Sequence, residues 1–335
     1  MTDTTKRLRI LSGVQPSGTL HIGNYFGAIR QHIALQDEGD AFYFLANYHA
    51  LTTVNDAAAL RQLTRDAALD YLALGLDPKK ATFFRQSDVP EVCELTWLLS
   101  SVTGMGLLER AVSYKDKIAR GIQPRVGLFT YPVLMAADIL IYDADIVPVG
   151  ADQVQHIEMT RDMAGYFNSI YGETFKLPEP RLEEATAKVP GTDGQKMSKS
   201  YGNTIGIFDE GKALKTRVMG IVTDSTPVED PKDPEASTIW QLYRLVGAPD
   251  EVESMAEQFR SGGYGYGMAK KSLLEAIDRT FAPFREKRKQ LAEHPDDVEQ
   301  ILIEGAARAR GHARRVLDRA RWACGIASTS TDEHR

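Results

Sequence analysis

The segment from Ile10 to Ile29 constrains the fold of this 335-residue chain more than any other. It reads ILSGVQPSGTLHIGNYFGAI, an apolar run that breaks into small and polar residues and then resumes at helical spacing. This order predicts a buried strand, a tight turn and a helix. In a parallel sheet such a turn lies where helix N-termini bind phosphate groups. Gly23 lets a ligand approach the backbone closely, and His21 and Asn24 add neutral hydrogen-bond donors. An ordinary tight turn without a ligand is the alternative.

Strands and helices alternate along the first part of the chain. Apolar runs of strand length at residues 41–46, 82–85 and 145–149 are each followed by helical patterns. This alternation predicts an α/β fold with a doubly wound parallel sheet. The helices are expected after Asn55 or Asp56, from Pro90 past Leu107, over Tyr131–Tyr142 and from Gly150 onward.

The patterns beyond residue 200 are helical, apart from a short strand signal over Thr204–Phe208. We therefore expect two domains, residues 1–200 with the sheet and residues 201–335 all-helical. The sequence leaves open whether the last helix packs back on the first domain. Residues 281–322 contain more basic than acidic side chains. These side chains either form solvated helix faces or contact a nucleic-acid backbone.

The composition is that of a globular protein, with 43% hydrophobic and 26% charged residues. A net charge of -6 argues against a protein that coats nucleic acid by bulk electrostatics, although a local basic face is compatible with it. The two cysteines, Cys93 and Cys324, lie far apart, so neither a disulfide framework nor a cysteine zinc site is predicted. We expect no signal peptide and no membrane span, and a reducing cytoplasm fits this cysteine usage.

A second motif, KMSKS at Lys196–Ser200, follows a loop rich in glycine, proline and aspartate. Two lysines on a loop are in themselves consistent with a solvated charge cluster. The pairing of KMSKS with the upstream HIGN turn, however, resembles the two signatures of class I aminoacyl-tRNA synthetases. The stretch Gly127–Asp162 looks like that of the tryptophanyl-tRNA synthetases in particular, and the resemblance extends from Ile10 to about Ile221.

One face of the expected helix over Tyr131–Tyr142 carries Tyr131, Met135 and Asp138. A carboxylate in so apolar a segment needs a partner. Asp138 is therefore either a cap or part of an internal salt bridge, or it accepts from a ligand N–H such as that of indole. Tyrosyl-tRNA synthetases have a similar segment but typically glutamine in place of Met135. A thioether suits the apolar face of indole, so this position favours tryptophan over tyrosine.

The resemblance implies a Rossmann-like class I core that activates L-tryptophan with ATP and transfers it to tRNA(Trp). It also implies an anticodon-binding helical domain, Mg2+ bound mainly through ATP phosphates without a protein metal site, a homodimer and a cytoplasmic location. The catalytic positions that it implies are His21, Asn24, Lys117, Lys196 and Lys199. The tryptophan-binding positions are Tyr131, Met135, Asp138 and Gln153. The ATP-binding positions are Gln15, Pro16, Ser17, Gly23, Asn24, Gly150, Ala151, Asp152, Val189, Lys196, Met197, Ser198, Lys199 and Ser200.

Three alternatives remain from the sequence. The chain could be a tyrosyl-tRNA synthetase, or another nucleotidyl transferase with an HxGH-like turn. It could also be a synthetase paralogue that no longer charges tRNA and acts as a binding module. The intact His21, Lys196 and Lys199 argue against the last of these. NYHALTT at Asn47–Thr53 and the loop before KMSKS depart from the family pattern, which leaves the ATP contacts there undetermined.

Overall fold

A computed structural model describes residues 7–16, 18–111, 121, 125–150, 153–182 and 189–327. Its centre is a five-stranded sheet in the order β3-β2-β1-β4-β5, in which every neighbouring pair is parallel. This arrangement confirms the predicted α/β class. The strands are β1 (Arg9–Val14), β2 (Asp40–Leu45), β3 (Thr82–Arg85), β4 (Ile146–Val149) and β5 (Glu179–Leu182).

Helices cover both faces of the sheet. Alternate residues of a strand point to opposite faces, so a strand of apolar residues presents apolar side chains on both faces. On β2, Tyr43 and Leu45 join one hydrophobic cluster, and Phe42 and Phe44 join the other. The first cluster includes helices α4 and α13, and the second includes α5, α8, α9 and α14. The helices that accompany the sheet are α1 (Ile22–Asn24), α2 (Arg30–Ala34), α3 (Asn47–Ala50), α4 (Ala57–Ala73), α5 (Glu91–Val102), α6 (Met105–Glu109), α8 (Val126–Leu140) and α9 (Val154–Tyr171).

Three expectations about these elements were wrong. α8 begins at Val126 rather than Tyr131, so Pro132 lies inside the helix, where it removes one backbone donor. The helical stretch from Pro90 past Leu107 is not one helix, because Thr103 is extended and divides it into α5 and α6. The helix expected from Gly150 begins at Val154. Strand β5 was not predicted, since its largely exposed sequence EPRL has no alternation of apolar residues to reveal it.

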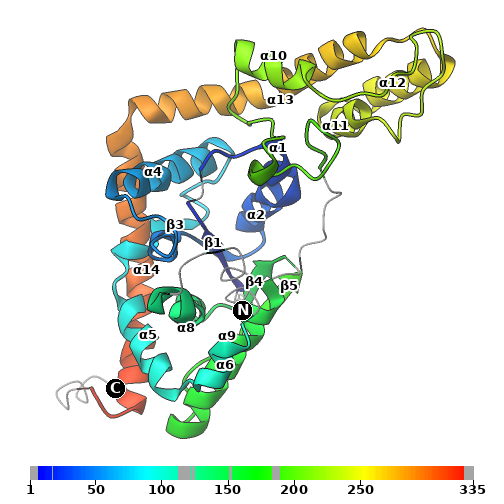
Figure 1. The fold of residues 1–335 in the computed structure, drawn as a ribbon. Helices are drawn as coiled ribbons and strands as arrows, with labels where there is room; N and C mark the ends of the chain where they lie inside the picture. The colour runs from blue at the N-terminus through cyan, green and yellow to red at the C-terminus, as the bar shows by residue number, and fades with distance from the viewer. Residues whose placement is uncertain are drawn as a thin grey trace, which may run out of the picture.

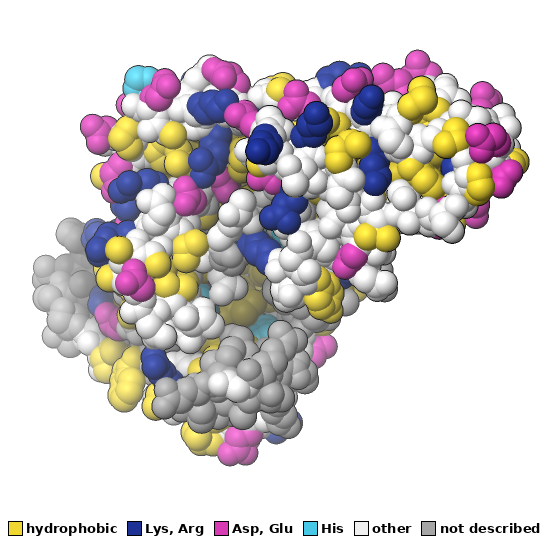
Figure 2. Space-filling model, turned by 45° about the horizontal axis from the view of Figure 1, so that its top comes forward, with side chains coloured by type: hydrophobic (Ala, Val, Ile, Leu, Met, Phe, Trp, Pro, Cys, Tyr) yellow, Lys and Arg dark blue, Asp and Glu magenta, His cyan; other side chains and the backbone are white. Residues whose placement is uncertain are grey.

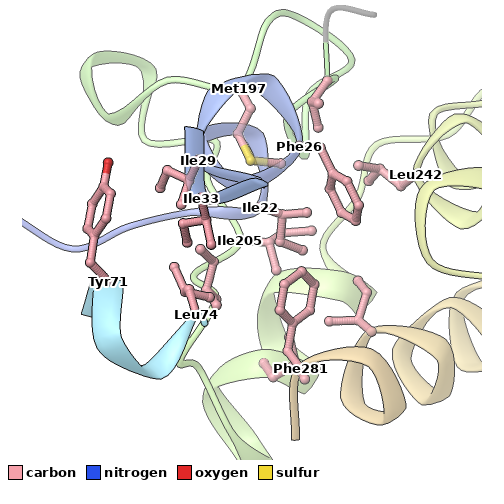
Figure 3. Packing of buried hydrophobic residues seen from close by; sticks show 14 of the residues in the cluster. Ile22, Phe26, Ile29, Ile33, Tyr71, Leu74, Met197, Ile205, Leu242 and Phe281 are labelled. Atoms are coloured by element: carbon pink, nitrogen blue, oxygen red, sulfur yellow. The ribbon is translucent and has the colours of Figure 1, made fainter. Parts of the chain in front are cut away.

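The second part of the chain is helical, and its first helices lie beyond the carboxyl edge of the sheet (Figure 1). The predicted strand signal at Thr204–Phe208 is a short pairing with the HIGN segment: Ile22 N donates to Ile205 O at 3.0 Å, and Ile207 N to Leu20 O at 3.1 Å. One buried cluster contains residues from both sides of position 200 (Figure 3). The division into domains at residue 200 stays a prediction. The helices are α10 (Gly211–Met219), α11 (Thr238–Val246), α12 (Pro249–Ser261), α13 (Tyr266–Glu293) and α14 (Pro295–Ala323).

The last helix returns to the sheet. α13 crosses over α4, and α14 then runs along β3 and α5 (Figure 1). Arg310 and Arg314 pair with Glu91, Arg319 with Asp143, and Arg321 with Glu94. These four arginines remain partly exposed, but they are not only a solvated helix face: they fasten α14 to α5 and to the loop after α8. Among the described residues, no helix is both long enough and apolar enough to cross a bilayer.

We expect the contact between α14 and β3 to tolerate no side chain at Gly305. A Cβ there would lie 1.7 Å from the carbonyl oxygen of Phe83, whereas a Cβ at Gly311 on the same helix would meet nothing within 4 Å. Gly305→Ala should lower the free energy of unfolding by about 2 kcal/mol or more through overpacking. Gly311→Ala, the matched control, should raise it by a few tenths to about 1 kcal/mol. Denaturant unfolding measures both, and equal effects would contradict this account.

Candidate active site

The HIGN turn is held in shape by a reciprocal pair of hydrogen bonds. His21 Nδ1 accepts from the backbone N of Asn24 at 3.2 Å, and Asn24 Oδ1 accepts from the backbone N of His21 at 3.0 Å. This is a capping box at the start of α1. Because the acceptor atoms of both side chains face the backbone, His21 keeps its proton on Nε2, and the amide Nδ2 of Asn24 is a donor.

His21 is a neutral side chain in this environment. It is buried, and burial together with the smaller effect of the nearby Lys199 lowers its pKa to about 4. A neutral imidazole donates one hydrogen bond without competing for the cations that neutralise phosphate. The prediction that His21 and Asn24 offer uncharged donors is consistent with this geometry.

The KMSKS motif lies on the second arm of a hairpin whose first arm begins at Val189. Met197 N donates to Val189 O at 2.9 Å, and Pro190 and Lys196 form an antiparallel bridge. The side chain of Met197 is buried against the helix that follows HIGN (Figure 3). Its Sδ accepts from Gly23 N at 3.3 Å. The two motifs, which are far apart in the sequence, are therefore in direct contact.

Gly23 makes this contact possible. A Cβ at Gly23 would lie 3.0 Å from His21 Nδ1 and 3.1 Å from Met197 Cβ. Both distances are tighter than ordinary van der Waals contact, so a larger residue would push the two motifs apart. Val189 and Met197 are buried in the same hydrophobic cluster, so any contact that they make with a nucleotide comes through their backbone.

Asn203, which we did not single out from the sequence, braces the KMSKS loop. Its side chain is buried, its Oδ1 accepts from Ser198 N at 2.8 Å, and its Nδ2 donates to Asp193 and to Lys196 O. Gly191 packs against it so closely that a Cβ there would lie 2.3 Å away. An asparagine soon after KMSKS was the available signal, but a pattern cannot show that its amide reaches back to the loop.

Lys199 lies over the turn between β1 and α1. Its Nζ is 3.9 Å from the position that a Cβ on Gly18 would take. Burial lowers the pKa of Lys199, and the nearby Asp70 carboxylate opposes that shift. Lys199 is nonetheless exposed, as are Lys196 and Ser200, and Ser198 Oγ lies 2.8 Å from Ser200 Oγ. The space-filling view shows Lys and Arg side chains beside a hollow near the middle of this face (Figure 2).

Asp138 is buried and has protein partners. His49 Nε2 donates to its Oδ2 at 2.8 Å, and Gln86 Nε2 donates to both of its oxygens at 2.9 and 2.8 Å. Burial raises the pKa of Asp138, against the lowering effects of His49 and Gln86. His49 and Gln86, which follow β2 and β3, were not singled out from the sequence. Of the two alternatives for Asp138, the internal network is present.

The same helix places Tyr131 and Met135, which are half-buried, on the face that carries Asp138. The hydroxyl of Tyr131 lies 2.7 Å from His156 Nε2 on α9. Met135 packs against the cluster that also contains α5 and α9. The predicted wall of the amino-acid pocket is therefore one continuous surface of α8, joined to α9 at one end and to the ends of β2 and β3 at the other.

The remaining predicted positions lie along the carboxyl edge of the sheet where the structure describes them. Gln15 and Pro16 follow β1, while Gly150 and Gln153 lie between β4 and α9. Ser17, Lys117, Ala151 and Asp152 are outside the described residues. Among the residues with a described placement, no group of three or more His, Cys, Asp or Glu side chains has the geometry of a metal site.

Comparison with known proteins decides the family. A family model described as tRNA synthetases class I (W and Y) matches residues 2–282. The chain belongs to this family. Among these synthetases it is 58% identical over 319 residues to a tryptophan–tRNA ligase of Rhodopirellula baltica, covering 95% of this chain and 100% of the relative. It is 56% identical to the tryptophan–tRNA ligase of Fusobacterium nucleatum, with 95% and 98% covered.

Solved structures of the family have the same fold. The crystal structure of the tryptophanyl-tRNA synthetase of Campylobacter jejuni, complexed with ADP and tryptophan, matches with a TM-score of 0.92 and 50% identity. The match covers 95% of this chain and 100% of that one.

We expect His21 to make the stability of this synthetase depend on pH. The folded chain keeps His21 neutral down to about pH 4, whereas a histidine in an unfolded chain takes up its proton near pH ~6.5. The unfolded state therefore binds more protons between these values, and the contribution of His21 to stability falls as the pH falls through this window.

His21→Asn removes the titrating group and keeps a capping acceptor. The difference in unfolding free energy between wild type and variant should shrink by about 1 kcal/mol or more from pH ~6.5 to ~4.5. Denaturant titrations at several pH values measure it. Parallel curves for the two proteins would show that His21 is not held neutral.

Proposed function

We infer that the chain is a tryptophan–tRNA ligase, which activates L-tryptophan to tryptophanyl-adenylate and transfers the aminoacyl group to tRNA. The observation that carries this inference is the contact between Met197 of KMSKS and Gly23 of HIGN, which brings both signature motifs to one sheet edge. The identity to tryptophan–tRNA ligases over nearly the whole chain supports the same function.

Tryptophan is favoured over tyrosine by the chemistry of the α8 wall. Met135 presents an apolar thioether, which suits the face of an indole ring. A site for the phenol of tyrosine would gain instead from the amide of a glutamine at this position. Asp138 Oδ1 accepts from Gln86 in the described structure, and a carboxylate oxygen has capacity for a second donor. We propose that the indole N–H is that donor, and that Tyr131 and Gln153 lie near the ammonium group of the amino acid.

The first step needs alignment and charge neutralisation rather than a general base. The tryptophan carboxylate is ionised at neutral pH and attacks the α-phosphorus of ATP, and pyrophosphate leaves. His21 Nε2–H and Asn24 Nδ2 donate to the phosphates, and Lys196 and Lys199 stabilise the charge that develops on the leaving group. Lys117 is proposed to assist by family resemblance.

The nucleotide lies along the sheet edge in this proposal. Gln15, Pro16 and Ser17 follow β1, and Gly150, Ala151 and Asp152 follow β4, where backbone groups can reach ribose and adenine. Val189, Met197, Ser198 and Ser200 close the site from the hairpin. The triphosphate end presents imidazole N–H, amide and ammonium groups, which are donors. We therefore propose that Mg2+ is carried by the ATP phosphate oxygens themselves.

Three further properties are proposals. The helical part lies beyond the active-site edge and is proposed to bind the anticodon arm of tRNA(Trp). A homodimer is proposed because Trp97, Met105 and Val126 are 74%, 62% and 78% exposed on α5, α6 and α8, and α8 contacts both of the other helices. A cytoplasmic location follows from the proposed role in translation.

The function is tested by ATP–pyrophosphate exchange without tRNA. We expect exchange that depends on tryptophan and is far weaker with tyrosine. Lys199→Ala should slow exchange by about tenfold or more while tryptophan binding stays nearly intact, because the lysine acts mainly on charge that develops in the transition state. Exchange driven equally by tyrosine would overturn the specificity, and unchanged exchange in the variant would remove Lys199 from its role.

Asp138 is tested by ligand discrimination. Asp138→Asn keeps the shape of the side chain but offers only one carbonyl oxygen, which His49 and Gln86 already occupy. We expect its loss of affinity for tryptophan to exceed its loss for an isostere without the indole N–H by about tenfold. Calorimetric titration of both ligands measures this difference, and equal losses would mark the carboxylate as purely structural.

A further inference from the structure

One arginine of α13 is buried where the helical part meets the HIGN turn. Arg285 is 3% exposed, and no other arginine is buried in the part of the chain that the structure describes. Its Nη1 pairs with Asp278 Oδ1 at 2.6 Å, and its Nε donates to Ile207 O at 3.0 Å. Its Nη2 is buried and has no hydrogen-bond partner among the described residues. A buried and incompletely paired charge is costly, so stability alone does not account for this side chain.

The peptide that Arg285 binds supports the HIGN turn directly. Ile207 N donates to Leu20 O at 3.1 Å. The neighbouring residues His21 and Gly206 form an antiparallel bridge. Both polar groups of the Ile207 backbone are therefore in use, the N–H by the residue before His21 and the carbonyl by Arg285.

Aromatic side chains hold α13 against the same turn. The ring centroid of Phe281 lies 5.3 Å from that of Tyr25 and 6.1 Å from that of Phe26, and Phe284 lies 5.8 Å from Tyr25. Tyr25 and Phe26 directly follow the HIGN residues, and Figure 3 shows Phe281 and Phe26 in one buried cluster. Apolar burial is non-directional, so it sets how close α13 lies to the turn. A hydrogen bond is directional, so Arg285 can also orient the peptide that it binds.

We propose that Arg285 is a positioning residue for the HIGN turn, which it orients through the peptide of Ile207. That peptide in turn holds Leu20, the residue before His21. Donors that stabilise developing charge must be aimed before the reaction, and a small displacement removes much of their effect. The proposal rests on the proposed function, in which His21 and Asn24 donate to the phosphates of ATP.

Two substitutions separate the hydrogen bond from the charge. Glutamine has its Nε2 after the same number of side-chain atoms as arginine has its Nε, so Arg285→Gln keeps a donor for Ile207 O and loses the charge. Arg285→Met has a similar length and no donor. We expect Arg285→Met to lower kcat for ATP–pyrophosphate exchange by about tenfold, and Arg285→Gln to stay within about threefold of wild type. KM for tryptophan should not change in either variant, because the α8 wall is a separate surface. Equal losses of kcat, or no loss in Arg285→Met, would overturn the proposal.

Asp278→Asn is the matched control. It removes the charge that pairs with Arg285 but leaves the bond to Ile207 O in place, and the Asp278 side chain is largely exposed. Its rate of exchange should therefore stay within about twofold of wild type. A loss as large as that of Arg285→Met would assign the effect to the ion pair and would overturn the proposal.

A double-mutant cycle tests whether Arg285 acts through His21. In a His21→Ala background, Arg285→Met should lower kcat by no more than about twofold, because the donor that it helps to aim is already absent. A full tenfold loss in this background would show that the two residues act independently and would overturn the proposal. Arg285→Leu, which also lacks a donor, serves in both experiments if Arg285→Met does not fold.

Amide hydrogen exchange of the full-length protein gives a readout that does not depend on catalysis. Arg285→Met should speed exchange at the Ile22 and Ile207 amides by about tenfold, since both are donors in the pairing that Arg285 supports. Arg285→Gln should leave these amides near wild type, and the amides of α8 should not respond to either variant. Unchanged exchange at Ile22 and Ile207 in Arg285→Met would overturn the proposal.

The two hypotheses fail in different ways. If wild type shows no tryptophan-dependent pyrophosphate exchange, the proposed function fails, and the catalytic role of Arg285 falls with it whatever the amide exchange shows. If wild type shows this activity and His21→Ala slows it, while Arg285→Met changes neither kcat nor the amide exchange, the function stands and only the role of Arg285 is overturned.

Discussion

The contact between Met197 and Gly23 is the interaction on which the rest of the active site depends. It places the KMSKS loop on the HIGN turn, and burying one methionine side chain in this way stabilises that placement by about 1.5–3 kcal/mol. The contact exists because Gly23 has no side chain and because the thioether accepts from its backbone N–H. Lys199 follows Met197 by two positions, so fixing the methionine brings the lysine over the turn.

Two further devices hold the edges of this arrangement. The side chain of Asn203 binds two parts of the KMSKS loop together. Backbone hydrogen bonds of Ile205 and Ile207 with Ile22 and Leu20 then join the segment after the loop to the HIGN segment. α13 and α14 then bind the helical part to both faces of the sheet, largely through arginines that pair with buried or half-buried carboxylates.

The strands and the motif positions could be predicted because their signals are local. The strand at residues 82–85 and the helix cap at Asp56 were correct, since apolar runs and capping residues act within one turn of the chain. The beginning of α8 was misplaced because Pro132 was taken as a start signal, although neighbouring packing tolerates it inside the helix. Strand β5 has no apolar alternation and forms only because β4 offers it an edge.

The sequence by itself determined the fold class, the family and the identity of the candidate site residues, because periodicity and the pairing of HIGN with KMSKS are properties of the chain in order. Only the tertiary structure decided which side chains satisfy one another. That Asp138 is held by His49 and Gln86, and that Asp70 accepts from Arg288 of α13, could not be read from the pattern. A buried carboxylate must find donors, but which distant residues supply them depends on how helices from separate parts of the chain pack together.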